Sequence, residues 1–181
     1  MKVDRIKIYG CTCSGKTTFA LQLSEILDIP VFHIDDFFWE ENWKQRNPEE
    51  FRKDIENIVV KERWILDGNY DRVKDLILPR TTMIVILNPS LFTVYWRLII
   101  RSFARRGRRQ KNVTRLPEKI TEENRRFSAL RSIFELIPHA FKFKHKRLRT
   151  LKRESIRLLG KYNVFVLKNK KQIDSFMKAL S

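Results

Sequence analysis

The sequence has few cysteines and no long apolar run. Only 2 of its 181 residues are cysteine, and Cys11 and Cys13 lie two positions apart. That spacing is poor for a disulfide and lacks the partners of a zinc site, so we expect reduced thiols. The longest apolar runs, such as MIVIL, are the length of a strand and predict no membrane-spanning helix. The first residues, MKVDRIKIY, do not resemble a signal peptide because charges are scattered through them, and we expect a cytoplasmic protein.

Acidic residues are scarce in one part of the chain. The net charge is +17, but residues 1–96 contain 13 Lys or Arg and 15 Asp or Glu, whereas residues 97–161 contain 21 and 5. This second segment carries nearly all of the excess positive charge. It must therefore face an anionic partner or be heavily solvated.

Alternating strand and helix patterns predict the fold. Hydrophobic residues make up 43% of the chain, with 13 Phe and 4 Trp, which is enough for the core of one domain. Period-2 patterns predict five strands, at residues 3–9, 31–34, 63–67, 82–88 and 162–167. Helical patterns cover residues 16–27, 48–61, 70–77, 90–105, 121–159 with a break at Pro138, and 172–180. We therefore expect a single α/β domain over residues 1–181, with a five-stranded parallel sheet and helices on both faces.

The run GCTCSGKTT at residues 10–18 matches GxxxxGK[ST], a loop that binds nucleotide phosphates. A predicted strand precedes it and a predicted helix follows, as the motif requires. Backbone N–H groups and the positive end of the helix would attract the β-phosphate, Lys16 would reach the β and γ oxygens, and the Thr17 hydroxyl would bind Mg²⁺. The predicted cofactors are ATP and Mg²⁺. The predicted phosphate-binding residues are Gly10, Cys13, Ser14, Gly15, Lys16, Thr17 and Thr18.

Three carboxylates follow predicted strands. Ligands of open parallel sheets bind beyond the carboxyl ends of the strands, where Asp35 and Asp36 follow the strand at 31–34. Either could accept a proton from an attacking hydroxyl or orient an acceptor, but an Asp pair that caps a turn fits equally well. Asp67 ends the strand at 63–67, and we favour a role beside Mg²⁺ over a plain Asp-Gly turn. The aromatic residues of HIDDFFWEENW could stack on a ring or belong to the core.

Arginines recur at helical spacing near the middle of the chain. Arg97, Arg101 and Arg105 lie four residues apart and share one helix face, which leads into Arg108 and Arg109. Residues 104–118 are polar and basic, and we expect them to form a mobile excursion from the core. Arginines that close over a transferring phosphoryl group neutralise its charge and exclude water, so we interpret the group as a lid. A solvated basic face or a nucleic-acid patch would give the same pattern.

These motifs, in this order, resemble the P-loop kinases related to adenylate kinase and, more closely, the family labelled DNA topology modulation proteins. The resemblance covers most of the chain and is carried by GxxxxGKTT, HIDDFFWxxxW, WILDGNY and a WRxxxRS helix that runs into ARRGRR. It implies the P-loop nucleoside triphosphate hydrolase fold, with a strand order like 2-3-1-4-5 and an arginine-rich lid. The DDFF segment is similar to nucleoside kinases that act on riboses, which implies Asp35 as the base and Asp36 as the reserve. The DGNY segment lacks the arginine of adenylate kinases, so AMP is not implied as the acceptor.

The motifs together predict a phosphotransferase that moves the γ-phosphate of ATP to a small nucleotide- or nucleoside-like acceptor. Lys16 and the loop amides would hold the phosphates, while Thr17 and Asp67 would hold the metal. Asp35 would orient the acceptor. The arginines predicted to close over the transfer are Arg101, Arg105 and Arg109.

Two other functions remain open on the sequence. One is an ATP-dependent nucleic-acid-binding protein that affects DNA topology, although no base-reading module is recognisable. The other is an NTPase without a dedicated acceptor. No NKxD-like guanine signature is present, which favours ATP over GTP.

Overall fold

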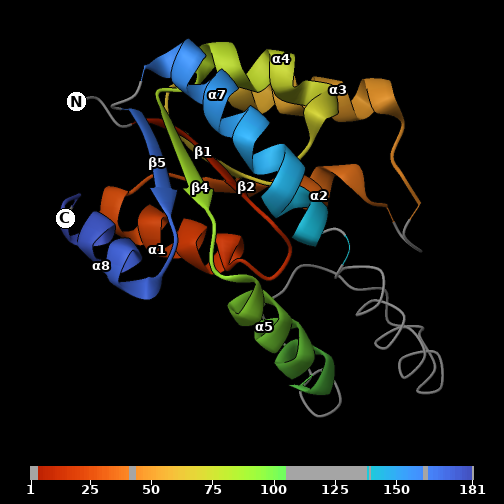
Figure 1. The fold of residues 1–181 in the computed structure, drawn as a ribbon. Helices are drawn as coiled ribbons and strands as arrows, with labels where there is room; N and C mark the ends of the chain where they lie inside the picture. Colours follow the sequence, from red (N-terminus) through yellow and green to blue (C-terminus); the bar gives the residue numbers. More distant parts are fainter. Residues whose placement is uncertain (1–3, 41–43, 105–137, 139, 161–162, 181) are drawn as a thin grey trace.

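A parallel sheet lies between two layers of helices in the computed structural model (Figure 1). The structure describes residues 4–40, 44–104, 138, 140–160 and 163–180. All four strand pairings are parallel, and the order β2-β3-β1-β4-β5 matches the expected 2-3-1-4-5. The predicted five-stranded parallel sheet with helices on both faces is therefore confirmed. The strands are β1 (Arg5–Gly10), β2 (Val31–His33), β3 (Trp64–Asp67), β4 (Met83–Leu87) and β5 (Val164–Leu167).

The described helices follow the predicted pattern with one addition, while residues 121–137 of the helix predicted at 121–159 lie outside the described residues. Helix α2 (Ile34–Phe38) begins where we expected the second strand to continue. Asp35 and Asp36 lie in its first turn, where negative charge is favourable beside unpaired N–H groups. Among the described residues, no helix is long and apolar enough to span a membrane. The other helices are α1 (Lys16–Leu27), α3 (Pro48–Val59), α4 (Lys74–Ile77), α5 (Leu91–Ala104), α7 (Leu148–Leu159) and α8 (Lys170–Lys178), with short helical turns η2 (Asp71–Val73), η3 (Leu78–Arg80) and η4 (Phe143–Arg147).

The central strand β1 separates two hydrophobic layers. Ile6 and Ile8 pack with side chains of α1 and α8 on one face of the sheet. Tyr9 points to the other face, where it packs with residues of β4, η4 and α7. Because side chains alternate along a strand, Lys7 shares the face of Tyr9. Figure 1 shows the same division, with α1 and α8 on one side of the sheet and α3, α4 and α7 on the other.

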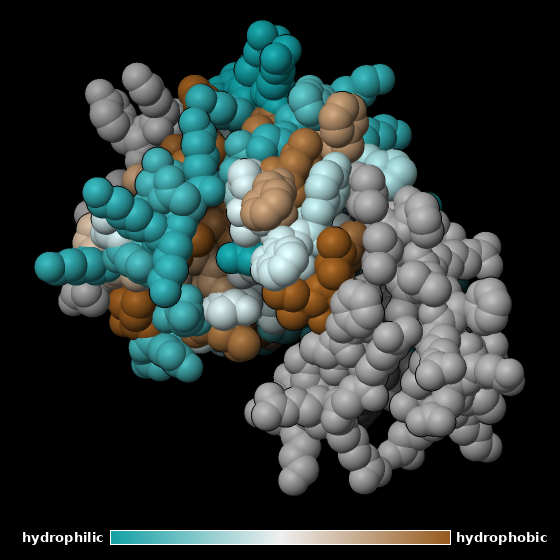
Figure 2. Space-filling model, turned by 60° about the horizontal axis from the view of Figure 1, so that its bottom comes forward, coloured by the Kyte–Doolittle hydropathy of each residue, from teal (hydrophilic) through white to brown (hydrophobic). Residues whose placement is uncertain are grey.

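Helix α5 projects from the carboxyl end of β4 (Figure 1). Its inner side contributes Val94 to the core, whereas Phe92 is 78% exposed and Trp96 is 57% exposed. Figure 2 brings this end of the molecule forward and shows hydrophobic side chains among charged ones on the surface. The apolar residues of α5 therefore divide between the core and the outer surface.

A second hydrophobic cluster supports the region after β3, and Phe51 of α3 lies at its centre. The Phe51 ring is 2% exposed, and its centroid lies 5.3 Å from that of Phe38 and 5.7 Å from that of Tyr70. The cluster therefore connects α2, α3 and the turn that follows β3.

We predict that Phe51→Ala lowers the free energy of unfolding by about 3–5 kcal/mol, because it leaves a cavity among rings that cannot all move inward. Urea denaturation monitored by circular dichroism measures the change. Phe92→Ala is the matched control and should change the stability by less than about 0.5 kcal/mol, since that ring is largely in solvent. Equal losses for the two variants would contradict this account of the core.

Candidate functional site

The loop between β1 and α1 has the conformation of an anion-binding turn. Cys13 has φ +54° and Gly15 has φ +94°, and the Ser14 N–H donates to the Cys11 carbonyl over 3.2 Å. Gly15 precedes α1, and within the described part of the chain no side chain caps this helix. The N–H groups of the first helical turn are thus open to a ligand, and the helix dipole favours an anion there.

Gly10 is required where the loop leaves β1. A Cβ at this position would lie 2.5 Å from the Ser14 hydroxyl oxygen and 3.0 Å from the Leu87 carbonyl oxygen. Lys16 extends across the loop, and its ammonium group donates to the Cys11 carbonyl over 3.0 Å. The loop is therefore tightly closed, with the lysine predicted to bind phosphate lying across it.

Asp67 lies beside the loop at the end of β3. Its Oδ2 accepts hydrogen bonds from the Thr17 hydroxyl over 3.1 Å and from His33 Nδ1 over 3.3 Å. Burial opposes ionisation of this carboxylate. The His33 hydrogen bond and the charges of Lys16 and Lys7 outweigh it and hold the pKa of Asp67 below its usual value. The same hydrogen bond raises the pKa of His33, a residue to which the sequence assigned no role.

The Thr17 and Asp67 pair fits a divalent cation. Asp67 is 5% exposed, and its Oδ1 is buried without a hydrogen-bond partner in the described residues. A hydroxyl oxygen and an ionised carboxylate are the hard oxygen ligands that Mg²⁺ prefers. The described residues contain no group of three or more His, Cys, Asp or Glu side chains that could hold a metal ion. Nucleotide phosphates and water would therefore have to complete the coordination.

The turn Gly68–Asn69–Tyr70 connects this loop to Asp35. The Asn69 side chain pairs with both backbone groups of Gly10: Nδ2 donates to the carbonyl over 2.5 Å, and Oδ1 accepts from the N–H over 3.3 Å. The Tyr70 hydroxyl donates to Asp35 Oδ1 over 2.5 Å. Gly68 has φ +138°, and a Cβ there would lie 3.0 Å from Cβ of Ile34. The DGNY motif therefore links the phosphate loop to the first turn of α2.

The two neighbouring aspartates of α2 lie in different surroundings. Both Asp35 and Asp36 are exposed, but Asp35 is the one held by Tyr70. Burial and this hydrogen bond raise the pKa of the Tyr70 hydroxyl, so Tyr70 remains a donor at neutral pH. Of the aromatic residues in this segment, Phe38 is buried in the core and its ring centroid lies 4.7 Å from that of Tyr70.

Lys7 is a buried lysine to which the sequence assigned no role. It is 1% exposed, and its ammonium group donates to the Gly68 carbonyl over 2.8 Å. Burial lowers its pKa to about 7, with Asp67 opposing and Lys16 adding to the effect. A signal was present in the sequence, because a central strand of a parallel sheet is covered on both faces. A lysine in the middle of that strand has to be buried.

Two arginines contact the site, one at the loop of residues 10–18 and one at the turn that follows β3. Arg97 of α5 donates through Nη1 to the Ser14 carbonyl over 3.0 Å. Arg147 of η4, which the sequence did not single out, donates through Nη2 to the Asn69 carbonyl over 3.1 Å and to Asp71 over 2.6 Å. The predicted lid arginines are not placed: Arg105 and Arg109 lie outside the described residues, as does the side chain of Arg101. The lid at residues 104–118 remains a prediction, because all of it after Ala104 lies outside the described residues.

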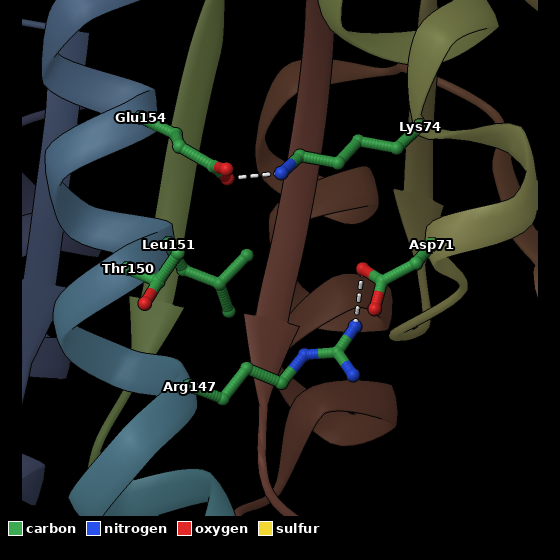
Figure 3. A pocket seen from close by; sticks show the side chains of 6 residues that line it. All are labelled: Asp71, Lys74, Arg147, Thr150, Leu151 and Glu154. Atoms are coloured by element: carbon green, nitrogen blue, oxygen red, sulfur yellow. Dashed lines mark hydrogen bonds and ion pairs between the residues drawn. The ribbon is translucent and has the colours of Figure 1, made fainter.

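A groove of about 290 Å³ lies beside Arg147, between η2 and α4 on one side and η4 and α7 on the other (Figure 3). Two ion pairs cross it, Arg147 with Asp71 and Lys74 with Glu154. These pairs connect η4 and α7 to the segment that follows the DGNY turn. A neighbouring groove of about 430 Å³ shares Asp71 and Lys74. Neither groove is lined by residues of the phosphate loop. The residues that line the first are Asp71, Lys74, Arg147, Thr150, Leu151 and Glu154.

Both cysteines of the loop are free thiols, as expected. Cys11 is buried, and burial raises the pKa of its thiol. The neighbouring Lys16 charge acts in the opposite direction but is the smaller effect. Cys11 therefore resembles a small core residue more than a reactive thiolate.

The comparisons with known proteins give a structural likeness and no sequence relative. No protein-family model matches the chain, and no curated protein matches it. The crystal structure of shikimate kinase from Bacteroides thetaiotaomicron is similar over 98% of this chain and 96% of that chain, at 19% sequence identity and a TM-score of 0.48. The resemblance to the DNA topology modulation family remains a prediction from the motifs.

Lys7→Met should remove a pH dependence of the stability. The pKa of Lys7 falls from 10.5 to about 7 on folding. Between these values the unfolded chain binds more protons than the native protein, so the stability of the native protein rises with pH. From about pH 7 to about pH 9, the unfolding free energy of the wild type should rise by about 2 kcal/mol relative to the variant.

Urea denaturation of both proteins in the presence of a chelator measures this difference. All other titrating groups are common to the two proteins, so their contributions largely cancel. If the difference in unfolding free energy between the two proteins stays constant over this pH range, the pKa of Lys7 is not lowered.

Proposed function

We propose that the protein transfers the γ-phosphate of ATP, with Mg²⁺, to a hydroxyl or phosphate of a small nucleotide- or nucleoside-like acceptor. The observation that carries the proposal is the set of contacts around the DGNY segment. Asp67 accepts a hydrogen bond from Thr17 of the phosphate loop. Tyr70, three residues after Asp67, donates a hydrogen bond to Asp35. The residues proposed to bind the nucleotide and the acceptor would therefore act at one edge of the sheet, beyond the carboxyl ends of β1, β2 and β3.

The phosphate loop would bind the nucleotide. In this proposal the loop amides and the amino end of α1 bind the β-phosphate, and Lys16 leaves the Cys11 carbonyl to contact the β and γ oxygens. Thr17 and Asp67 would hold Mg²⁺, which neutralises charge on the phosphates. Arg97 lies close enough to the loop to add positive charge beside it, because its guanidinium nitrogen is 3.3 Å from where a Gly15 Cβ would lie.

Asp35 would orient the acceptor. A carboxylate at this position accepts the proton of the attacking hydroxyl while the acceptor oxygen forms its bond to the γ-phosphorus. The bond between that phosphorus and the oxygen bridging to the β-phosphate breaks, and ADP leaves with the electron pair. The hydrogen bond from Tyr70 favours Asp35 over Asp36 in this role, because it fixes the carboxylate.

The nucleic-acid alternative rests on the basic segment, and part of that charge already has protein partners. Lys144 donates to the Pro89 carbonyl over 3.2 Å, and Arg147 is bonded to Asn69 and Asp71. These contacts favour a structural role for the two side chains over phosphate binding on a duplex. Tight, ATP-sensitive binding of duplex DNA in a salt titration would support the alternative. ATP hydrolysis without transfer to any acceptor of a broad panel would support the NTPase alternative.

Lys16→Ala should weaken binding of Mg²⁺ with a non-hydrolysable ATP analogue by about 10–100-fold, the usual effect of losing a charge-assisted contact to phosphate. Isothermal titration calorimetry measures the affinity. Lys44→Ala removes a lysine whose side chain is 79% exposed and should leave the affinity unchanged. Unaltered affinity in the Lys16 variant would refute the proposed phosphate site.

Asp35→Asn should reduce the transfer rate at least about 100-fold while leaving nucleotide affinity unchanged, because it removes a proton acceptor and not a phosphate contact. A thermal-shift screen with the ATP analogue and Mg²⁺ first selects an acceptor, and coupled detection of ADP then measures transfer. Asp36→Asn is the matched comparison. If only Asp36→Asn abolishes transfer, the base is Asp36 and this assignment is wrong.

A further inference from the structure

Lys7 occupies the most buried position of the site and is not explained by packing. It lies in the middle of β1, paired in register with Leu66 of β3 and Ile84 of β4, which are both fully buried. A charged amine in such surroundings loses its hydration, which is unfavourable. A methionine of similar length would fill the same space without that loss.

The hydrogen-bond partner of Lys7 suggests a role for the buried lysine. Its ammonium group donates to the Gly68 carbonyl, which begins the turn that follows the proposed metal ligand Asp67. The next carbonyl, that of Asn69, accepts from Arg147 on the other side. Two consecutive carbonyls of the turn therefore accept hydrogen bonds from basic side chains of different parts of the chain.

This turn carries the side chains that define the site. Asn69 bonds both backbone groups of Gly10, and Tyr70 bonds Asp35. A shift of the Gly68 peptide would move both side chains, because they follow it directly in the chain. The geometry of the turn thus decides how the phosphate loop and α2 are placed relative to each other.

We propose that Lys7 is a positioning residue, which fixes the Gly68–Tyr70 turn and through it the Asn69 contact with the phosphate loop and the Tyr70 contact with Asp35, at a cost in stability. The kinetic consequence rests on the proposed function, but the consequence for the geometry of the turn does not. A purely structural lysine would stabilise the fold, and its loss would lower the unfolding temperature. Replacement of a lysine that only positions the turn would not lower the unfolding temperature.

The Gly10 amide reports the position of Asn69, because its N–H donates to Asn69 Oδ1. In Lys7→Met, hydrogen exchange of this amide followed by NMR should be at least about tenfold faster than in the wild type, since the Asn69 contact loosens. Exchange of the Ile84 and Val85 amides in the sheet should be unchanged. The thermal midpoint at about pH 7 should equal or exceed that of the wild type.

Two further variants test whether the effect on Gly10 passes through Asn69 and whether any change in the core would cause it. Asn69→Ala removes the same contact directly, and the double variant Lys7→Met with Asn69→Ala should exchange no faster at Gly10 than Asn69→Ala alone. Ile84→Val is the matched core control, because Ile84 is the register partner of Lys7. It should lower the thermal midpoint slightly and leave exchange at Gly10 unchanged.

The kinetic part of the test uses the selected acceptor and the Mg²⁺–ATP analogue. Lys7→Met should lower kcat at least about tenfold while the affinity for the nucleotide analogue changes less than about threefold. Unchanged exchange at Gly10, additive effects in the double variant, or a lower thermal midpoint with normal kcat would each overturn the proposal. If the wild type fails to bind the nucleotide, the proposed function fails, and the exchange measurements still decide the role of Lys7.

Discussion

The arrangement of the site depends on the short turn that follows β3. Gly68, Asn69 and Tyr70 are consecutive, yet they bond to Lys7 of β1, to Gly10 at the start of the phosphate loop and to Asp35 of α2. A parallel sheet brings the carboxyl ends of its strands together but does not fix the loops that leave them. Here the hydrogen bonds of one turn fix two of these loops, so nucleotide and acceptor groups would keep a constant separation.

Buried charges near the turn balance one another only in part. Asp67 stays ionised because His33, Lys16 and Lys7 surround it, whereas Lys7 gains less from Asp67 than it loses through burial. The carboxylate is therefore stabilised in its charged form and the lysine is not. Such unequal pairs are typical of functional sites, where a fold accepts a local cost that a structural core would avoid. A bound divalent cation beside Asp67 would add another positive charge and disfavour the Lys7 ammonium further.

Most of the fold could be predicted from the sequence, because it depends on local patterns. The five strands and helix α1 follow from alternation and from the phosphate-loop motif. The pairing of Thr17 with Asp67 follows because Asp67 ends β3, while Thr17 begins the helix after the loop that leaves the adjacent strand β1. Helix α2 was not foreseen, since five residues give too short a pattern to separate from the end of a strand. The contacts of Asn69 and Arg147 span 59 and 78 residues. Spacing along the chain carries no information on such side-chain bonds, which only the packed structure determines.

Two arginines of the basic segment at residues 97–161 make contacts near the candidate site. Helix α5 precedes residues 105–137 and places Arg97 on the Ser14 carbonyl, while η4 follows them and places Arg147 on the Asn69 carbonyl. Arg97 therefore lies beside the loop at residues 10–18, and Arg147 lies beside the turn that follows β3. Both contacts are made to backbone carbonyls beyond the carboxyl ends of the strands. Arg97 would add positive charge beside the loop, whereas the charge of Arg147 is paired with Asp71. Under the proposed function, nucleotide phosphates would account for positive charge beside the loop at residues 10–18, so the position of Arg97 needs no nucleic-acid partner to explain it.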